Sequence, residues 1–274
     1  MNESITNWAA CIVYYQDLSS LQSLINNLNN QTLKPSQIFI ADNASSKDVF
    51  IQNSNIPLKI IKLNSNLGFG AAANAAIKNA IENGLERFIL LSQDVLLEAD
   101  SCQKLIDKLN KHHGIVFPTM YNRKTNNVFS KGGVINKFTG KIELKTKKVP
   151  KKIYWADGSC LCFDKKTYLS LNGFSEQYFM YFEDVDFCLR AYSNKIILNH
   201  VETNASQNPN GPNPFLRSRN SVLLSRNYDF KFFKLAVLKR NILAALLLLI
   251  KLHLRDSWQR FVGIYAGLKV KIEK

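Results

Sequence analysis

Short apolar runs alternate with helically spaced apolar residues through the first part of the chain. Four runs predict strands, at residues 9–15, 37–41, 57–63 and 87–92, and the first of them is expected to be buried. Apolar residues at helical spacing predict a helix over 18–28, and an alanine-rich segment predicts another over 71–82. Strands and helices in this order predict an α/β domain with a mostly parallel central sheet and helices on both faces.

The pattern is less regular in the middle of the chain. Apolar runs predict strands at 114–118, 154–163 and 195–199, and a short helix at 165–171. The lysine-rich segment 127–152 predicts hairpins or a mobile loop. From about Phe179 onward, the spacing of the aromatic residues predicts a further helix.

The C-terminal part has a different character. From Pro212, arginines and lysines are frequent among apolar residues, which predicts a catalytic or binding domain over 1–211 and a basic helical extension over 212–274. Trp258 and Tyr265 are candidate interfacial anchors, so the extension is interpreted as lying against an anionic membrane surface. The alternative is a helix pair packed on the core with a solvated lysine rim. The longest apolar run, 242–250, is too short to span a bilayer, which takes roughly 20 residues.

The composition narrows the class of protein without selecting a partner. Of the 274 residues, 46% are hydrophobic and 21% charged, which is typical of a folded globular protein. The net charge of +15 favours phosphates, anionic lipid or nucleic acid as partners. Five scattered cysteines without a CxxC pair indicate reduced thiols in a cytosolic protein, and make a zinc site improbable. The first fifteen residues lack a basic region followed by an apolar core, so no signal peptide is expected.

The residues directly after the predicted strands are the first candidates for function. Ligands of parallel α/β sheets gather at the carboxyl ends of the strands. Five side chains occupy such places: Tyr14, Tyr15, Asp42, Asn66 and Asp94. Asp42 is also a candidate N-cap, Asp94 a candidate helix cap, and the glycines after Asn66 serve equally well in a tight turn.

The segment 173–190, GFSEQYFMYFEDVDFCLR, combines aromatic residues with four acids. Adjacent helical residues do not share a face, so Glu183 and Asp184 are expected to point in different directions, one held by the scaffold and one facing a cleft. Asp186 precedes Arg190 by four residues, the spacing of a surface ion pair. The alternative is an aromatic core helix with an acidic solvent face.

Five segments in this order resemble the family 2 glycosyltransferases of bacterial surface-polysaccharide assembly, particularly their rhamnosyltransferase-like branch. They are ADNAS (41–45), NLGFGAAAN (66–74), LLSQDV (90–95), the acidic segment 173–190, and Arg219-Asn220. The resemblance covers roughly residues 8–225. It implies a GT-A fold, a nucleotide-sugar donor, a divalent metal, and transfer with inversion at the anomeric carbon.

The resemblance also implies which residues bind the nucleotide sugar. Asp42 would accept the N3–H of a uracil or thymine ring. The other residues implied or expected on this side are Tyr14, Asn66, Gly68, Asn74, Gln93, Trp155 and Asp157.

The metal and the catalytic base are implied in the same way. Asp94 would hold Mn²⁺ or Mg²⁺ on the diphosphate, although Ser92 stands where the family pattern has a first acid. His200 matches a histidine that completes the metal site in several relatives, and its alternative is a core histidine. Asp184, with Glu183 second, would take the proton of the acceptor hydroxyl.

The resemblance implies a UDP- or dTDP-sugar donor, with dTDP-L-rhamnose as one candidate, and a glycan or lipid-linked acceptor in cell-surface polysaccharide biosynthesis. The expected location is the cytoplasm, peripheral at the inner face of the cell membrane. Three alternatives stay open: a sugar-1-phosphate nucleotidyltransferase, a non-catalytic nucleotide-sugar binder, and a nucleic-acid binder. The first lacks a glycine- and arginine-rich loop after the first strand, and no nucleic acid is expected because the basic excess is confined to the tail and the lysine-rich segment.

Overall fold

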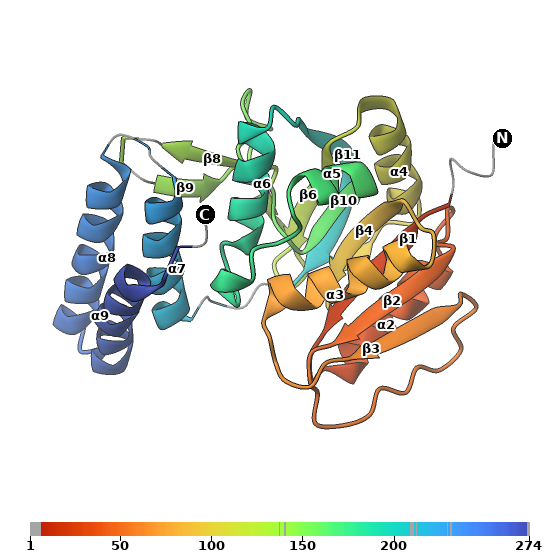
Figure 1. The fold of residues 1–274 in the computed structure, drawn as a ribbon, viewed down its shortest axis with the longest axis horizontal. Coiled ribbons are helices and arrows are strands. Elements are labelled where there is room, and N and C mark those ends of the chain that lie inside the picture. Colours follow the sequence, from red (N-terminus) through yellow and green to blue (C-terminus); the bar gives the residue numbers. More distant parts are fainter. Residues whose placement is uncertain are drawn as a thin grey trace. The chain divides into compact units, whose positions relative to one another are not determined.

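The computed structural model describes residues 7–136, 138–139, 141–208, 211, 213–228, 230 and 232–272 (Figure 1). The chain forms two compact units, here called unit 1 and unit 2. Unit 1 comprises residues 1–133, 144–179 and 183–209, and unit 2 comprises 134–143, 180–182 and 210–274. Pro212, where the sequence predicts the domain boundary, lies outside the described residues, and that boundary stays a prediction.

Unit 1 is built on a mixed sheet (Figure 1). In the described part of the chain this sheet has nine strands, in the order β3-β2-β1-β4-β10-β6-β11-β5, with β7 beside β6. β3, β2, β1 and β4 run parallel, β10 is antiparallel to both β4 and β6, and β6 is parallel to β11. The strands are β1 (Ala9–Tyr14), β2 (Gln37–Asp42), β3 (Leu58–Lys62), β4 (Arg87–Ser92), β5 (Leu96–Leu97), β6 (Ile115–Asn122), β7 (Asn127–Ser130), β10 (Cys160–Asp164) and β11 (Leu198–Gln207).

Helices cover both faces of this sheet. One core cluster joins buried side chains of α2 (Leu18–Asn29) and α4 (Ser101–His112) to alternate residues of the central strands. On the other face lie α3 (Phe69–Glu82), α5 (Lys165–Ser170) and α6 (Glu183–Ser193) (Figure 1). There Phe163 of β10 packs against the rings of Tyr168 and Phe187. The α/β fold predicted from the apolar pattern is therefore confirmed.

The register of the parallel strands determines what meets at the carboxyl edge of the sheet. Tyr14 pairs with Asp42 between β1 and β2, and Asp42 pairs with Lys62 of β3. On the other side of β1, Val13 pairs with Ser92, the last residue of β4. The segments that follow Tyr14, Asp42 and Ser92 consequently leave the sheet side by side.

Several predicted elements were wrong in their bounds. Strand β6 extends to Asn122 rather than ending at residue 118, and of the segment 154–163 only the part in β10 (Cys160–Asp164) is a strand, with an isolated bridge at Trp155. Helix α6 begins at Glu183 rather than near Phe179, because Phe179, Tyr181 and Phe182 all have positive φ angles (61°, 67° and 76°), which no α-helix contains. The last strand is 198–207 rather than 195–199. Its polar residues give no apolar run, so the periodicity did not reveal it.

Unit 2 consists mainly of three helices, α7 (Pro214–Asn227), α8 (Phe233–Ile250) and α9 (Leu254–Lys269), with most of the hairpin β8 (Gly133–Asn136) and β9 (Lys141–Leu144). α7 and α9 approach closely at glycines: a Cβ on Gly263 would lie 2.4 Å from the carbonyl oxygen of Phe215. None of the described helices has the length and hydropathy that crossing a bilayer requires.

Candidate active site

Asp42 ends β2 at the carboxyl edge of the sheet, as its place in the sequence predicts. Its carboxylate is buried, and its Oδ1 accepts a hydrogen bond from the backbone N–H of Ser45 at 2.9 Å. No helix follows it, so the N-cap alternative does not apply. The neighbouring Tyr14 is 2% exposed and packs within the hydrophobic core, whereas Tyr15 is 44% exposed. Of the two tyrosines, Tyr15 is therefore the one available to a ligand, which corrects the choice of Tyr14.

Asn43, which the sequence did not single out, ties this edge to the glycine loop. Its Nδ2 donates to Asn66 Oδ1 at 2.8 Å, and its Oδ1 accepts from the Leu67 N–H at 2.8 Å. Asn66 Oδ1 also accepts from the Gly68 N–H at 3.0 Å. The side chain of Asn66 is thus used to shape the loop. The sequence signal that could have identified Asn43 is its position as a polar residue directly after Asp42.

Gly68 is required by the protein's own backbone. Its φ is +88°, and a Cβ there would lie 2.0 Å from the carbonyl oxygen of Phe179. The same oxygen accepts a hydrogen bond from the Phe69 N–H at 2.6 Å. The absence of a side chain at Gly68 thus lets the backbone of this loop approach the turn that precedes Glu183.

Asn74 braces the chain rather than facing a ligand. Its Nδ2 donates to Phe174 O (2.9 Å) and Glu176 Oε1 (3.1 Å). Its Oδ1 accepts from the Phe174 N–H (2.9 Å) and from the hydroxyl of Tyr168 (3.0 Å). The amide is buried and satisfied on both sides. In this structure Asn74 joins α3 to the segment that leads to α6, and its contact with a nucleotide sugar stays a prediction.

We expect Asn74→Ala to lower the free energy of unfolding by about 2–4 kcal/mol, because it leaves the buried Phe174 N–H and the Tyr168 hydroxyl without partners. Asn79→Ala is the matched control on the same helix, since the Asn79 side chain donates only to the Ala75 carbonyl. Urea unfolding of the two variants measures the difference. Equal losses in both variants would contradict the bracing role.

Gln93 and Asp94 follow β4 at the same edge and differ in what they contact. The Gln93 amide is used by the backbone of Tyr15: it accepts from the Tyr15 N–H at 2.6 Å and donates to its carbonyl at 3.1 Å. The Asp94 Oδ1 accepts from Nε2 of Gln207 at 3.0 Å. That Nε2 also reaches Ser92 Oγ at 3.2 Å. Gln207, at the end of β11, is therefore a site residue that the sequence did not reveal.

A continuous hydrogen-bond network links Asp94 to the acids of two other segments. Gln207 Oε1 accepts from the hydroxyl of Ser159 at 2.8 Å, and the Ser159 N–H donates to Asp157 Oδ1 at 3.0 Å. The next N–H toward the N-terminus, that of Gly158, donates to Asp184 Oδ2 at 3.0 Å. Asp94, Asp157 and Asp184, distant in the sequence, consequently meet around one loop.

Three acids in or beside this network, Asp184, Glu183 and Asp157, have raised pKa values. Burial, and then the charge of Asp157, raise the pKa of Asp184 to about 7, against the effect of the N–H groups of Gly158 and Val185. Burial and the neighbouring Asp184 raise the pKa of Glu183 well above its ordinary value. Burial also raises the pKa of Asp157. Glu183 is 6% exposed and Asp184 is more accessible, so the two neighbouring acids differ in their exposure to solvent.

This arrangement predicts a particular dependence of stability on pH. The pKa of Asp184 is raised in the folded state above about 3.9 in the unfolded chain, so the folded state binds more protons between pH 4 and 7. The free energy of unfolding should therefore fall as pH rises through this window. We expect urea unfolding at pH 5 and pH 8 to show a smaller difference in Asp184→Asn than in the wild type. The exposed-site control Asp107→Asn should keep the wild-type difference, and an unchanged difference in Asp184→Asn would contradict the raised pKa.

Asp186 and Arg190 form the expected pair, but not on the surface. Their atoms Oδ2 and Nε are 2.8 Å apart, and the Asp186 side chain is 5% exposed. Arg190 also donates to the carbonyls of Leu171 and Gly173. The pair therefore anchors α6 to the turn before it, and the charge of Asp186 adds to the causes that raise the pKa of Glu183.

His200 does not join Asp94 in this structure. Its Nε2 lies 2.8 Å from Thr119 Oγ1, its ring packs edge-on against Phe117, and burial lowers its pKa. On the paired strand β6, five residues separate the partner of His200 from the partner of Gln207, which is about 16 Å. His200 therefore lies apart from Asp94, beside which Gln207 lies in this structure, and its role as a metal ligand stays a prediction.

Trp155 is 8% exposed and packs on Gly133, where a Cβ would lie 2.0 Å from its Nε1. Its peptide bridges to that of Gly133, with a hydrogen bond of 2.7 Å from the Gly133 N–H to the Trp155 carbonyl. The contacts present fix the loop that carries Asp157.

The donor set at Asp94 fits a hard divalent cation that also binds substrate phosphates. No group of three or more His, Cys, Asp or Glu side chains within the described ranges could enclose a metal by itself. Mg²⁺ and Mn²⁺ commonly use one or two carboxylates together with substrate phosphates and water. One carboxylate beside the amide of Gln207 and the hydroxyl of Ser92 is such an open set.

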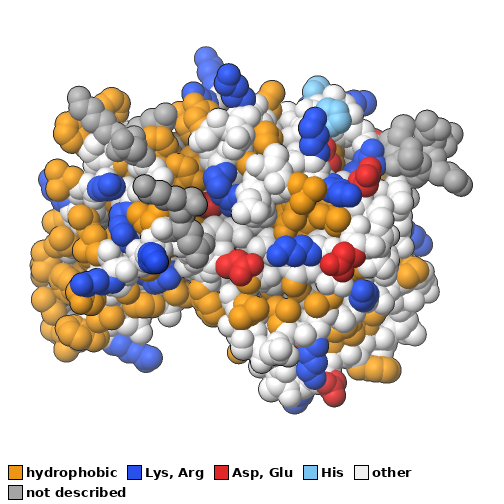
Figure 2. Space-filling model, viewed as in Figure 1, with side chains coloured by type: hydrophobic (Ala, Val, Ile, Leu, Met, Phe, Trp, Pro, Cys, Tyr) orange, Lys and Arg blue, Asp and Glu red, His pale blue; other side chains and the backbone are white. Residues whose placement is uncertain are grey.

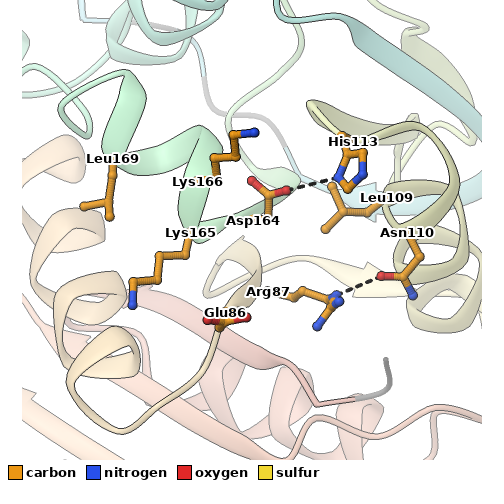
Figure 3. Close-up of a pocket in the computed structure, with 9 residues that line it drawn as sticks. All are labelled: Glu86, Arg87, Leu109, Asn110, His113, Asp164, Lys165, Lys166 and Leu169. Atoms are coloured by element: carbon orange, nitrogen blue, oxygen red, sulfur yellow. Dashed lines mark hydrogen bonds and ion pairs between the residues drawn. The ribbon is translucent and has the colours of Figure 1, made fainter. Parts of the chain in front are cut away.

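A hollow of about 540 Å³ lies at the opposite edge of the sheet (Figure 3). Its lining includes Arg87, where β4 begins, and Asp164, where the antiparallel β10 ends. Arg87 Nε donates to Asn110 at 2.7 Å, and His113 lies 3.5 Å from Asp164. It contains none of the acids of the network, so it is not the candidate site.

The comparisons with known proteins show the family and the fold of the chain. The family model described as "Glycosyl transferase family 2" matches residues 9–166, and the chain belongs to this family of glycosyltransferases. Two curated relatives are similar to it: the low-salt glycan biosynthesis hexosyltransferase Agl10 of Haloferax volcanii (22% identical, covering 61% of this chain) and the dTDP-rhamnosyl transferase RfbF of Shigella flexneri (24% identical, covering 73%). These names are consistent with the rhamnosyltransferase-like branch. The chain spans 57% and 67% of the lengths of these two relatives.

Solved structures show the same fold. GalNAc-T7 with UDP, GalNAc and Mn²⁺ matches with a TM-score of 0.64 at 14% identity, over 85% of this chain and 50% of that one. Staphylococcus aureus TarS 1–349 with UDP-GlcNAc matches with a TM-score of 0.57 at 16% identity, over 81% and 67%. The predicted GT-A fold is confirmed.

Proposed function

We propose that this chain transfers a sugar from a UDP- or dTDP-sugar, dTDP-L-rhamnose among the candidates, to a hydroxyl of a glycan or lipid-linked acceptor, with inversion at the anomeric carbon. The observation that carries the proposal is the network of Asp94, Gln207, Ser159, Asp157 and Asp184. In this network, around one loop at the carboxyl edge of the sheet, we assign Asp94 to the phosphate side and Asp184 to the side of the general base.

Asp184 is the proposed general base. The attacking hydroxyl loses its proton as its oxygen bonds to the anomeric carbon and the bond to the diphosphate oxygen breaks. A carboxylate with a pKa of about 7 is half ionised near neutral pH and accepts that proton efficiently. The Gly158 N–H orients it. Glu183 is the weaker candidate, because its carboxyl is buried and burial raises its pKa well above the ordinary value.

Asp94 is the proposed metal ligand, with Gln207 and Ser92 beside it. A bound Mg²⁺ or Mn²⁺ would neutralise charge on the departing diphosphate. Gln207 keeps the carboxylate of Asp94 turned toward the loop of Asp157. GalNAc-T7, which shares the fold, was crystallised with Mn²⁺ and UDP.

Asp42 and Tyr15 are proposed to bind the uracil or thymine ring of the donor nucleotide. The buried Asp42 carboxylate can accept the N3–H that uracil and thymine share, and guanine offers a different edge. The exposed ring of Tyr15 lies at the end of the adjacent strand. Gln93 supports Tyr15 through its backbone.

A nucleotide-sugar donor and five free, buried cysteines favour a cytoplasmic site of action. The acceptor is proposed to belong to cell-surface polysaccharide assembly, the class of process in which the branch resembled by this chain operates.

The test of this proposal is a thermal-shift panel of UDP, dTDP and GDP sugars with and without Mn²⁺. Uridine or thymidine nucleotides should raise the melting temperature only when the metal is present. An equal rise with GDP-sugars would contradict the role of Asp42, and a rise that does not need the metal would contradict the role of Asp94.

A further inference from the structure

Helix α8 exposes an apolar face to solvent. Its buried residues recur every four positions, at Phe233, Val237, Asn241 and Ala245, and these pack within unit 2. The opposite side of the helix would be polar if it only faced water. Instead it carries exposed leucines and isoleucines, namely Ile242, Leu243, Leu246, Leu247, Leu249 and Ile250.

The exposure is greatest where α8 turns into α9. Leu252 in this turn is 81% exposed, and Ile250 is 76% exposed. Leu254 and Trp258 continue the apolar surface onto α9, with Trp258 70% exposed. Figure 2 shows hydrophobic side chains gathered over this part of unit 2, with lysines and arginines among them. We call the exposed apolar residues from Leu246 to Trp258 the hairpin tip. A contiguous patch of this kind marks a surface that is covered in use.

The surroundings of the hairpin tip are basic. Residues 212–274 contain thirteen lysines and arginines but only three acids, so most of the net charge of +15 lies here. Lys251 and Arg255 are exposed within the tip itself. The occupant of this surface should therefore combine alkyl chains with negative charge.

An anionic bilayer has this chemistry, and the other occupants fit less well. Nucleic acid would require exposed aromatic platforms, and the tip is mostly aliphatic. The core of a protein interface is depleted in charged residues, whereas Lys251 lies between Ile250 and Leu252. Basic side chains beside aliphatic residues, with a tryptophan at the margin, are typical of helices that lie in the membrane interface.

We propose that the α8–α9 hairpin tip inserts into the headgroup region of an anionic lipid bilayer without crossing it. Ile250, Leu252 and Leu254 enter the acyl boundary, and Lys251 and Arg255 bind lipid phosphates. This inference does not depend on the proposed sugar transfer, since it rests on unit 2 alone. Its consequence would be a transferase held at the surface where lipid-linked acceptors reside.

The chain carries its own reporter for this proposal. Its three tryptophans are Trp8, Trp155 and Trp258, and the first two are 0% and 8% exposed. A change in tryptophan emission on adding vesicles therefore reports Trp258. With vesicles of phosphatidylcholine and phosphatidylglycerol, we expect a blue shift and quenching by brominated acyl chains. Pure phosphatidylcholine should bind at least tenfold more weakly, and 0.5 M salt should weaken binding to the anionic vesicles.

The matched variants introduce negative charge either within the hairpin tip or at an exposed site outside it. Ile250→Glu with Leu254→Glu should reduce vesicle co-sedimentation at least tenfold, because both side chains are exposed and their replacement leaves the core intact. Ile197→Glu, an equally exposed aliphatic position in unit 1, should bind vesicles like the wild type. Absence of quenching and of co-sedimentation at low salt would overturn the proposal. Light scattering that shows a dimer abolished by the tip variant would overturn it in favour of a second copy of the chain.

Discussion

Replacing Asp184 by asparagine should lower the rate of sugar transfer by about 10²–10⁴-fold, the usual contribution of a positioned general base. Asparagine keeps the shape of the side chain and can still accept the hydrogen bond from the Gly158 N–H, which in the wild type goes to Asp184 Oδ2 at 3.0 Å. It cannot take a proton from the acceptor hydroxyl. Donor affinity should be nearly unchanged, since the base acts on the acceptor.

The measurement is kcat together with donor Kd for the wild type, Asp184→Asn, Glu183→Gln and the control Asp107→Asn. The pKa of about 7 predicts that the wild-type rate falls as pH drops below 7, because the base becomes protonated. Glu183→Gln should keep most of the activity, since the Glu183 side chain is buried and is not the acid proposed to meet the acceptor. Full activity in Asp184→Asn would remove Asp184 as the base.

Replacing Asp94 by alanine should weaken metal-dependent donor binding by at least 10–100-fold, the range seen when even outer partners of metal ligands are removed. Asp94 is the carboxylate that Gln207 holds at the end of β11. Gln207→Leu should show a smaller loss in the same direction, because it leaves the carboxylate in place without its orienting amide. Titration calorimetry of a UDP- or dTDP-sugar with and without Mn²⁺ measures both.

If donor affinity in Asp94→Ala still depended on the metal as it does in the wild type, the metal would lie elsewhere. Asp107→Ala, which removes an exposed acid that pairs only with Gln103, is the control for the change in net charge.

The sheet and the acids at its edge could be read from the sequence because each depends on local pattern. Apolar runs determined β1, β2, β3 and β4, and parallel strands bring their carboxyl ends to one edge whatever the details of packing. Asp42 and Asp94 could be found for that reason. The different orientations of Glu183 and Asp184 followed from helical geometry, although α6 begins four residues later than expected.

The residues that the sequence did not reveal, or whose structural contacts it did not predict, depend on contacts between distant segments. Asn74 looks like a loop-border residue, yet four hydrogen bonds to residues about 100 positions away make it a brace. Gln207 was hidden because β11 is polar throughout and its apolar signal ends near residue 199. The family resemblance suggested His200, rather than Gln207, for the place beside Asp94. Only the register between β6 and β11 shows that these two residues lie far apart along the strand.

The most direct measurement of the central claim is a crystal structure of Asp184→Asn with a UDP- or dTDP-sugar and Mn²⁺. The account predicts that the nucleobase lies at Asp42 and Tyr15. It also predicts that the metal binds Asp94 and the diphosphate, and that the anomeric carbon faces residue 184. A nucleotide bound in the hollow beside Arg87 and Lys165, with Asp94 free of metal, would contradict it.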